Sequence, residues 1–413
     1  MNKDKDFLGT EPVGKLMFRL ALPTITAQLI NMLYNIIDRI YIGHIPGNGA
    51  LALTGVGVCM PLIMIISAFA ALVGGGGAPH ASIAMGKNDL NTAEHILGNC
   101  FFLQILISII LTVILLFGNR TFLLAFGASE NTIEYAVNYM NIYAVGTIFV
   151  QLTLGMNMFI TTQGFAKTGM LSVLIGAVMN IVLDPLFIFT LDMGTAGAAL
   201  ATGLSQFISF CILLWMCNHQ DSCISISIRK FRPKLAIYRE VLYGGIPSLG
   251  RQGIASVATI LMNFMCQPYG DAAIAAMSIV SRFMFFINSV IIGFGQGFQP
   301  VCSYCFGAGL YDRVKKACWF CIRVSTIILL VLSVISFPAA RSIITLFRRN
   351  DPTVIEIGTL ALRLQLITLP LQGAVIMGNM MPQSIGYGFR ATLVSTARQG
   401  IFLIPLLTIM TYT

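Results

Sequence analysis

The chain has 413 residues, of which 56% are hydrophobic and only 10% are charged. Soluble proteins carry about a quarter charged residues, so this composition excludes a soluble domain and indicates an integral membrane protein, whose partner is the lipid bilayer. The formal net charge of +9 could suggest nucleic-acid binding, but the basic residues lie in loops between apolar stretches and report membrane topology instead, so no nucleic-acid partner is expected.

The first apolar stretch covers residues 16–43 and carries a line of polar side chains. Five of them follow one another at intervals of four, three, four and three residues, which places them on one helix face: Thr24, Gln28, Asn31, Asn35 and Asp38. A carboxylate within a membrane span is costly and normally faces a protein interior or a water-filled cavity. The stretch therefore predicts one wall of a polar pocket, with Gln28, Asn31 and Asn35 as candidate substrate contacts and Pro23 as a candidate hinge.

Ten further stretches are long and apolar enough to span a bilayer, near residues 50–80, 95–117, 133–157, 163–190, 194–217, 238–266, 272–304, 316–337, 354–376 and 384–410. All are expected to be helices, because an open sheet cannot satisfy its backbone hydrogen bonds in lipid. The chain is therefore predicted to be an all-α membrane protein.

Lysine and arginine are unevenly distributed between the two sides of these spans. Fifteen lie in the N-terminal segment and the even-numbered loops, whereas the opposite side carries four: Arg120, Arg341, Arg348 and Arg349. Because basic residues accumulate in cytoplasmic loops, the N-terminus is expected in the cytoplasm. The longest polar loop, residues 218–237, is then a cytoplasmic linker.

Two halves of the chain repeat the same motifs. The pattern GxGxxPxxSxxxG occurs at residues 74–86 and again at 295–307, an offset of 221. The pair Pro23 and Gln28 recurs as Pro247 and Gln252. Matches in the same order indicate a duplication, and six spans per repeat give both halves the same orientation. We therefore expect two parallel six-helix bundles, residues 1–217 and 238–413, as in transporters built from parallel repeats.

The repeat also predicts where the last helix should begin. The sixth span starts near Gly194, so its copy should start near position 416, whereas the sequence ends at Thr413. The second bundle is therefore expected to hold five of its six helices, and a twelfth helix is expected to be missing from this chain.

Only two acidic residues lie deep within predicted spans, Asp38 and Asp184. Asn180 precedes Asp184 by one helical turn, and Pro185 follows it directly, which frees a backbone carbonyl and makes Pro185 a second candidate hinge. Two carboxylates, an amide oxygen and loosened carbonyls form an oxygen-rich site that suits a proton or a small cation such as Na⁺. The alternative is a structural role, with Asp38 paired to Arg39 or acting as a cap.

The seventh predicted span carries a polar face of its own. Its amide and hydroxyl side chains recur at helical spacing, but they include no acid. This face adds Gln252 and Asn263 to the candidate substrate contacts.

Two other motifs suggest different chemistry. Four cysteines have nearly the spacing of a zinc ribbon, but they lie in apolar helix ends, where cysteine acts as a small hydrophobe: Cys302, Cys305, Cys318 and Cys321. The glycine-rich run at residues 74–77 lacks the Lys-Ser/Thr of a phosphate-binding loop and lies within a span. Neither a structural metal nor a nucleotide is therefore expected.

Together these residues resemble the multidrug and toxic compound extrusion (MATE) transporters, most closely the DinF-like and MepA-like bacterial branch. The resemblance covers the whole chain and rests on P-x4-Q…NIIDRIYIG in the first span, N-x3-D-P in the fifth and GAALATG in the sixth. It implies a cation site in the N-terminal bundle that is formed by Asp38, Asn180, Asp184 and Thr202. Two further residues, Tyr139 and Asn157, are expected to support this site. The NorM-like branch also uses acids in the C-terminal bundle, and the seventh span of this chain lacks them.

The resemblance implies a multi-pass, monomeric protein of the bacterial plasma membrane that works as a cation-coupled multidrug efflux antiporter rather than an enzyme. Entry of H⁺ or Na⁺ would occupy Asp38 and Asp184, change the packing of the first helix and favour outward release of a lipophilic, often cationic drug. No cofactor is expected besides this coupling ion.

Two other functions are alternatives at this point. A flippase for lipid-linked oligosaccharides or lipids, from the same superfamily, would need basic residues along its cavity to hold a pyrophosphate, whereas these spans offer glutamine, asparagine and aspartate. An integral-membrane enzyme would need converging histidine, cysteine or acidic groups near one interface, and the four histidines are scattered along the chain: His44, His80, His95 and His219.

Overall fold

The computed structural model describes residues 7–218, 224, 231, 233–266, 270–347, 351–397 and 405, without the side chains of residues 255–257, 259, 260, 263, 264 and 271. Within these residues the chain is helical and contains no strand. Most of the predicted linker at 218–237 lies outside the described residues, and so do residues 398–404 and 406–410 of the eleventh predicted span.

The helices follow in this order: α1 (Phe7–Thr10), α2 (Val13–Gly43), α3 (Gly49–Gly86), α4 (Leu90–Ala125), α5 (Ile133–Thr162), α6 (Ala166–Pro185), the π-helical turn η2 (Leu186–Thr190), α7 (Gly194–Cys217), α8 (Leu235–Cys266), α9 (Asp271–Gly307), α10 (Tyr311–Phe347), α11 (Pro352–Ser384) and α12 (Gly388–Thr396). Along the described residues, nine helices are long and apolar enough to cross a membrane: α2–α5, α6 with η2, α7 and α9–α11. The predicted all-α membrane architecture is therefore confirmed. Helix α8 coincides with the seventh predicted span without being one of these nine, and α12 covers only the start of the eleventh.

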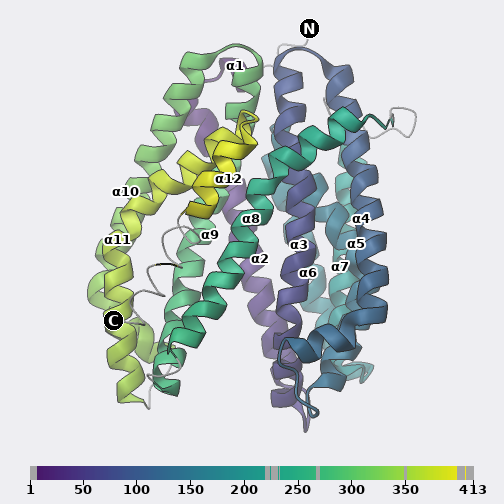
Figure 1. Cartoon of the computed structure of the whole chain (residues 1–413), viewed down its shortest axis with the longest axis vertical. Helices are drawn as coiled ribbons and strands as arrows, with labels where there is room; N and C mark the ends of the chain where they lie inside the picture. The colour runs from purple at the N-terminus through teal and green to yellow at the C-terminus, as the bar shows by residue number, and fades with distance from the viewer. Residues whose placement is uncertain are drawn as a thin grey trace.

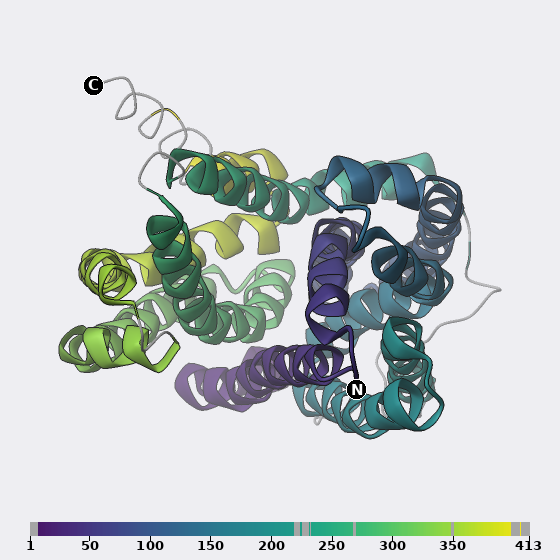
Figure 2. The ribbon, with the colours of Figure 1, turned by 90° about the horizontal axis from the view of Figure 1, so that it is seen from below.

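The long helices form two groups that lie side by side (Figure 1). Helices α3–α7 make up one group and α9–α12 the other, while α2 and α8 run along the boundary between them (Figures 1 and 2). Helix α2 contacts α6 of its own half and α9 of the other half, and α8 likewise contacts α12 and α3. The first helix of each half therefore packs against the second helix of the other half.

The duplicated sequence produces duplicated contacts. In the first half α3 contacts α4 and α5, and in the second half its counterpart α9 contacts α10 and α11. Across the boundary Thr24 Oγ1 donates a hydrogen bond to Gly293 O at 2.7 Å, and Gln28 Nε2 donates one to Gln296 Oε1 at 3.0 Å. These two bonds connect the polar face of α2 to α9.

Helices α3 and α9 cross at the last glycine of the repeated motif. A Cβ atom at Gly86 would overlap the carbonyl oxygen of Tyr304, and a Cβ atom at Gly307 would overlap that of Ile83. The two pairs correspond to each other at the repeat offset of 221, so the helices meet backbone to backbone through equivalent residues. Because a side chain at either glycine would prevent this approach, the motif brings the two halves into direct contact.

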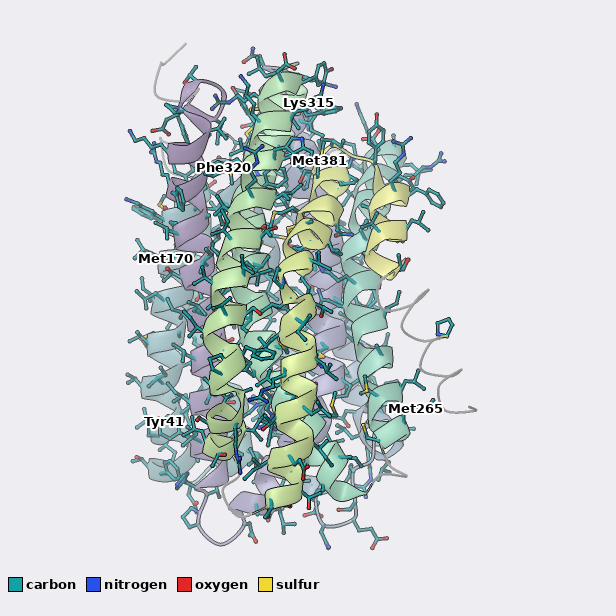
Figure 3. The ribbon with its side chains drawn as sticks, turned by 90° about the vertical axis from the view of Figure 1, so that its left-hand side faces the viewer. Tyr41, Met170, Met265, Lys315, Phe320 and Met381 are labelled. Carbon is teal, nitrogen blue, oxygen red and sulfur yellow. The ribbon has the colours of Figure 1, made fainter. Side chains whose placement is uncertain are left out.

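The N-terminal turn lies at the same end of the molecule as this crossing. Leu8 belongs to a buried apolar cluster with side chains of α9 and α10, and Leu8 O accepts hydrogen bonds from Arg313 Nε at 3.3 Å and Arg313 Nη2 at 3.1 Å. Figure 3 shows Lys315, near the start of α10, at this end and Tyr41, near the end of α2, toward the other. The two groups are therefore joined at the end where α10 begins.

Replacing Gly86 or Gly307 with alanine is expected to destabilise the protein by about 1–3 kcal/mol, because the new methyl group must push two backbones apart. Gly57→Ala on α3 is the matched control, since nothing lies within 4 Å of a Cβ atom there. Thermal unfolding of the purified variants in detergent measures the difference. Equal unfolding midpoints for all three variants would contradict a tight crossing.

Candidate functional site

A cavity of about 340 Å³ lies between helices α2, α3, α5, α6 and α7 of the first half and α9 of the second. One wall is the polar face of α2, and all of its five polar residues line the cavity: Thr24, Gln28, Asn31, Asn35 and Asp38. The cavity is bounded on the α3 side by the glycine-rich part of the repeated motif. The polar face of α2 thus points into the protein and not into lipid.

The four residues singled out for a cation site lie together. Asn180 Nδ2 donates to Asp184 Oδ1 at 3.3 Å and to Thr202 Oγ1 at 3.4 Å. The carboxyl groups of Asp38 and Asp184 are close enough for a hydrogen bond once one of them carries a proton. Asp38 and Thr202 line the cavity, whereas Asn180 and Asp184 lie behind them, with 1% and 0% of their surfaces exposed.

Helix α6 positions the two deeper members of this group. Asn180 and Asp184 are four residues apart and therefore share one helix face. Pro185 follows directly and has no N–H for a backbone hydrogen bond, and the chain continues as the wider π-helical turn η2. Such turns are frequent at functional sites.

Three oxygen atoms in this group have no hydrogen-bond donor among the described residues: Asp38 Oδ1, Asn180 Oδ1 and Asp184 Oδ2. All three are buried, and a buried carboxylate without a donor or cation costs several kcal/mol. Arg39 forms no ion pair with Asp38 in the described part of the chain, and its Nη2 instead contacts Met60 Sδ at 3.0 Å. The oxygens therefore fit a proton or a hard cation such as Na⁺, which takes carboxylate, amide and hydroxyl ligands.

The two supporting residues, Tyr139 and Asn157, have different neighbours. Tyr139 lines the cavity close enough to Asp38 to interact with its charge, and its ring stacks on Tyr143 with centroids 5.8 Å apart. Asn157 also lines the cavity, but its Nδ2 donates to Gly169 O at 3.0 Å and Ser172 Oγ at 3.3 Å. Tyr139 is thus part of the surroundings of Asp38, whereas the amide of Asn157 bonds to the N-terminal part of α6.

The candidate substrate contacts are only partly gathered in this cavity. Gln28, Asn31 and Asn35 line it, and Asn35 Nδ2 donates to Asn31 O at 2.6 Å. Gln252 on α8 is not among the described lining residues, and the side chain of Asn263 is outside the described part of the structure. The polar face predicted for the seventh span therefore adds no described residue to this cavity.

Sequence reasoning missed the wall that α9 contributes. Gln296, Gln299, Pro300 and Ser303 line the cavity from the second half of the chain. A signal was available, because all four lie in the second copy of the repeated motif. In the sequence that motif indicates the duplication, and two of its variable positions carry the glutamines.

The cysteine quartet lies elsewhere. All four side chains are buried in the apolar cluster that α9 and α10 share: Cys302, Cys305, Cys318 and Cys321. In the part of the chain that the structure describes, no group of three or more His, Cys, Asp or Glu side chains is arranged to hold a metal ion. The quartet therefore packs as small apolar side chains.

Comparisons with a family model, with relatives of known name and with solved structures all point to the same family. A family model named MatE matches residues 23–186 and 247–409, one segment in each repeat. The chain is 26% identical over 398 residues to multidrug export protein MepA of Staphylococcus haemolyticus (strain JCSC1435), covering 96% of this chain and 87% of that protein. It is 25% identical over 401 residues to multidrug export protein MepA of Staphylococcus aureus (strain MRSA252), covering 97% and 87%. A solved structure described as the outward-facing conformation of a multidrug resistance MATE family transporter matches with a TM-score of 0.92 and 25% identity, over 100% of this chain and 91% of that chain.

Asn180→Ala is expected to weaken Na⁺ or proton binding about tenfold or more, because the amide holds Asp184 and Thr202 in place and hydrogen bonds to charged groups contribute about 1.5–3 kcal/mol. Asn119→Ala is the matched control: this buried amide bonds to Asn141 at 2.6 Å, away from the cavity lining. Calorimetric titration with NaCl and potentiometric proton uptake are the measurements. Equal affinities in the two variants would contradict the cation site.

Proposed function

The chain belongs to the MatE family, as its sequence resemblance predicted, and we propose that it is an antiporter that exports lipophilic, often cationic small molecules in exchange for H⁺ or Na⁺. Family membership makes it a multi-pass membrane transporter rather than an enzyme, and one that needs no cofactor. The proposal of ion coupling is carried by the buried oxygens of Asp38, Asn180 and Asp184, which have no donor among the described residues.

The position of Asp38 suggests how cation binding is coupled to the movement of the two halves. Asp38 lies on α2, and α2 contacts both α6 in its own half and α9 in the other half. In the proposed cycle a cation from outside occupies Asp38 and Asp184, α2 shifts against α6, and the substrate is released outward. Loss of the cation to the cytoplasm restores the substrate-binding state. The scheme requires that the cation binds the two states with different affinity.

Two prolines are the proposed hinges of this movement. Pro23 is buried within the continuous helix α2 and provides no N–H for the carbonyl oxygen of Arg19. Its neighbour Thr24 directs its hydroxyl group to Gly293 across the boundary. Pro185 stands where α6 changes into η2, directly after Asp184. Pro23 therefore weakens α2 next to a contact between the halves, and Pro185 weakens α6 next to the site residue Asp184.

We further propose a monomer in the bacterial plasma membrane with its N-terminus in the cytoplasm, and bundles at residues 1–217 and 238–413 joined by the linker 218–237. The excess of lysine and arginine in the N-terminal segment and the even-numbered loops supports this orientation. This orientation makes the end that carries Lys315 cytoplasmic and the end near Tyr41 extracellular (Figure 3).

A flippase for lipid-linked oligosaccharides is the second candidate, and the cavity argues against it. A pyrophosphate is normally held by several lysine or arginine side chains. Among the described lining residues, Arg39 alone carries a permanent positive charge. The amide-rich walls suit an uncharged or cationic compound better than a pyrophosphate.

Asp38→Asn and Asp184→Asn are each expected to abolish ethidium efflux, because an amide cannot carry the charge that attracts the cation. The measurement is ethidium movement in energised membrane vesicles, under a pH gradient and under a Na⁺ gradient imposed separately. Asp312→Asn, an acid-to-amide change in the first turn of α10, is the control that should retain efflux. Normal efflux in both site variants would refute the coupling. In the wild type, the gradient that drives efflux, whether of pH or of Na⁺, identifies the coupling ion.

Pro23→Ala is expected to slow efflux several-fold while leaving ethidium binding intact, because the new N–H can complete the backbone ladder of α2 and stiffen it. Pro61→Ala, a proline inside α3 that does not line the cavity, is the matched control. Efflux rates and equilibrium ethidium binding separate the hinge from a binding defect. A Pro23→Ala variant that transports at the wild-type rate would exclude the hinge.

A further inference from the structure

Oxygen-bearing side chains continue from the cation-site residues along two helices of the first half. Thr202, Ser205 and Gln206 lie on one face of α7, and Thr153, Asn157 and Thr161 lie on one face of α5. All six line the same cavity as Asp38. We call these six residues the α5–α7 oxygen row.

Hydrogen bonds join members of the row to one another and to the cation-site residues. Thr202 accepts from Asn180 at 3.4 Å, which joins the row to Asp184. Thr153 Oγ1 donates to the backbone oxygen of Gln206 at 3.0 Å, which sets α5 and α7 at the same level. Thr161 Oγ1 donates to Asn157 Oδ1 at 3.3 Å. Each level therefore presents oxygen atoms toward the cavity.

The row leads from the cation-site residues to the end of α5. At 1.5 Å per residue, Thr202 to Gln206 covers about 6 Å and Thr153 to Thr161 about 12 Å, so the row spans about 18 Å. Thr161 precedes the last residue of α5, Thr162. Figure 3 shows Met170 of α6, which lines the same cavity, nearer to the Lys315 end than Tyr41 is. The row therefore runs toward the end that we propose to be cytoplasmic.

The middle of the row holds a polar atom that needs a partner. Gln206 Oε1 is buried and has no hydrogen-bond partner among the described residues. Leaving such an oxygen unsatisfied costs about 1–3 kcal/mol, whereas water or a hydrated cation would satisfy it. A cavity of about 340 Å³ has room for several water molecules at about 30 Å³ each.

We propose that the coupling cation leaves Asp38 and Asp184 for the cytoplasm through the interior of the first half, along the α5–α7 oxygen row, with the side-chain oxygen of Gln206 as an intermediate contact. This proposal rests on the proposed antiport function and adds the route of ion release. Hydroxyl and amide oxygens suit both Na⁺ and the water chain that carries a proton. Because the row belongs to α5 and α7, which pack directly on each other, it persists however the two halves move.

The experiment measures cation flux in proteoliposomes that contain the full chain. Ethidium is added, and the resulting movement of ²²Na⁺ and of protons, the latter reported by trapped pyranine, is followed for each variant. Gln206→Leu removes the intermediate oxygen, and Gln206→Asn restores one. The matched control is Gln365→Leu, the same change on α11, away from the described cavity lining. Thr153→Val, which keeps side-chain shape, tests the neighbouring level if Gln206→Leu does not fold.

Gln206→Leu is expected to lower cation flux about tenfold or more, with ethidium affinity within about twofold of the wild type. Gln206→Asn should recover most of the flux, and Gln365→Leu should leave it near the wild-type rate. Unchanged flux in Gln206→Leu, or in Thr153→Val where that variant replaces it, overturns the route, and so does an equal loss in the Gln365→Leu control. A wild type that carries no cation flux overturns the antiport function itself, whereas an active wild type with unaffected variants overturns the route alone.

Discussion

A carboxylate inside a membrane-spanning bundle must be neutralised by a proton, a cation or hydrogen-bond donors, because its desolvation costs several kcal/mol. Asp38 on α2 and Asp184 on α6 are both subject to this constraint. Asn180 of α6 donates hydrogen bonds to Asp184 and to Thr202 of α7. The described residues supply too few donors for their oxygens. The cavity, the π-helical turn after Pro185 and the polar face of α2 all surround this pair. A charge change there is the event from which the proposed transport cycle starts.

The packing of α2 explains why such an event can reach the whole molecule. Helix α2 contacts α6 in its own half and α9 in the other, and Thr24 and Gln28 bond directly to α9. At the end where α10 begins, the backbone crossing at Gly86 and Gly307 holds α3 and α9 together. The two halves are therefore joined by a close crossing at one end and by polar bonds along α2. Polar bonds are weaker constraints than a close-packed crossing, which makes α2 the element best placed to respond to the cation.

Several parts of the site could be predicted because they follow from spacing within one helix. The polar face of α2 and the pair Asn180 and Asp184 need only the period of 3.6 residues to be recognised. The α9 wall, by contrast, includes two glutamines at variable positions of a motif that by itself indicated only the duplication. The duplication also suggested that Gln252 would mirror Gln28, yet Gln252 is not among the described lining residues. Repeats share a helix order, but among the described residues the cavity lining comes from the first half and from one helix of the second, α9.

The amino-acid sequence alone is enough to predict an all-helical membrane protein built from two repeats, because hydropathy, backbone satisfaction in lipid and motif spacing are local or periodic properties. It also determined which polar residues lie on one face of each helix. Which of those faces meet is a property of the tertiary structure. It brought Asp38 against Asp184, turned the amide of Asn157 toward Gly169 and Ser172, and added Gln296 from α9 to the cavity wall. These outcomes depend on how helices distant in sequence cross one another, and no spacing within a single helix encodes that.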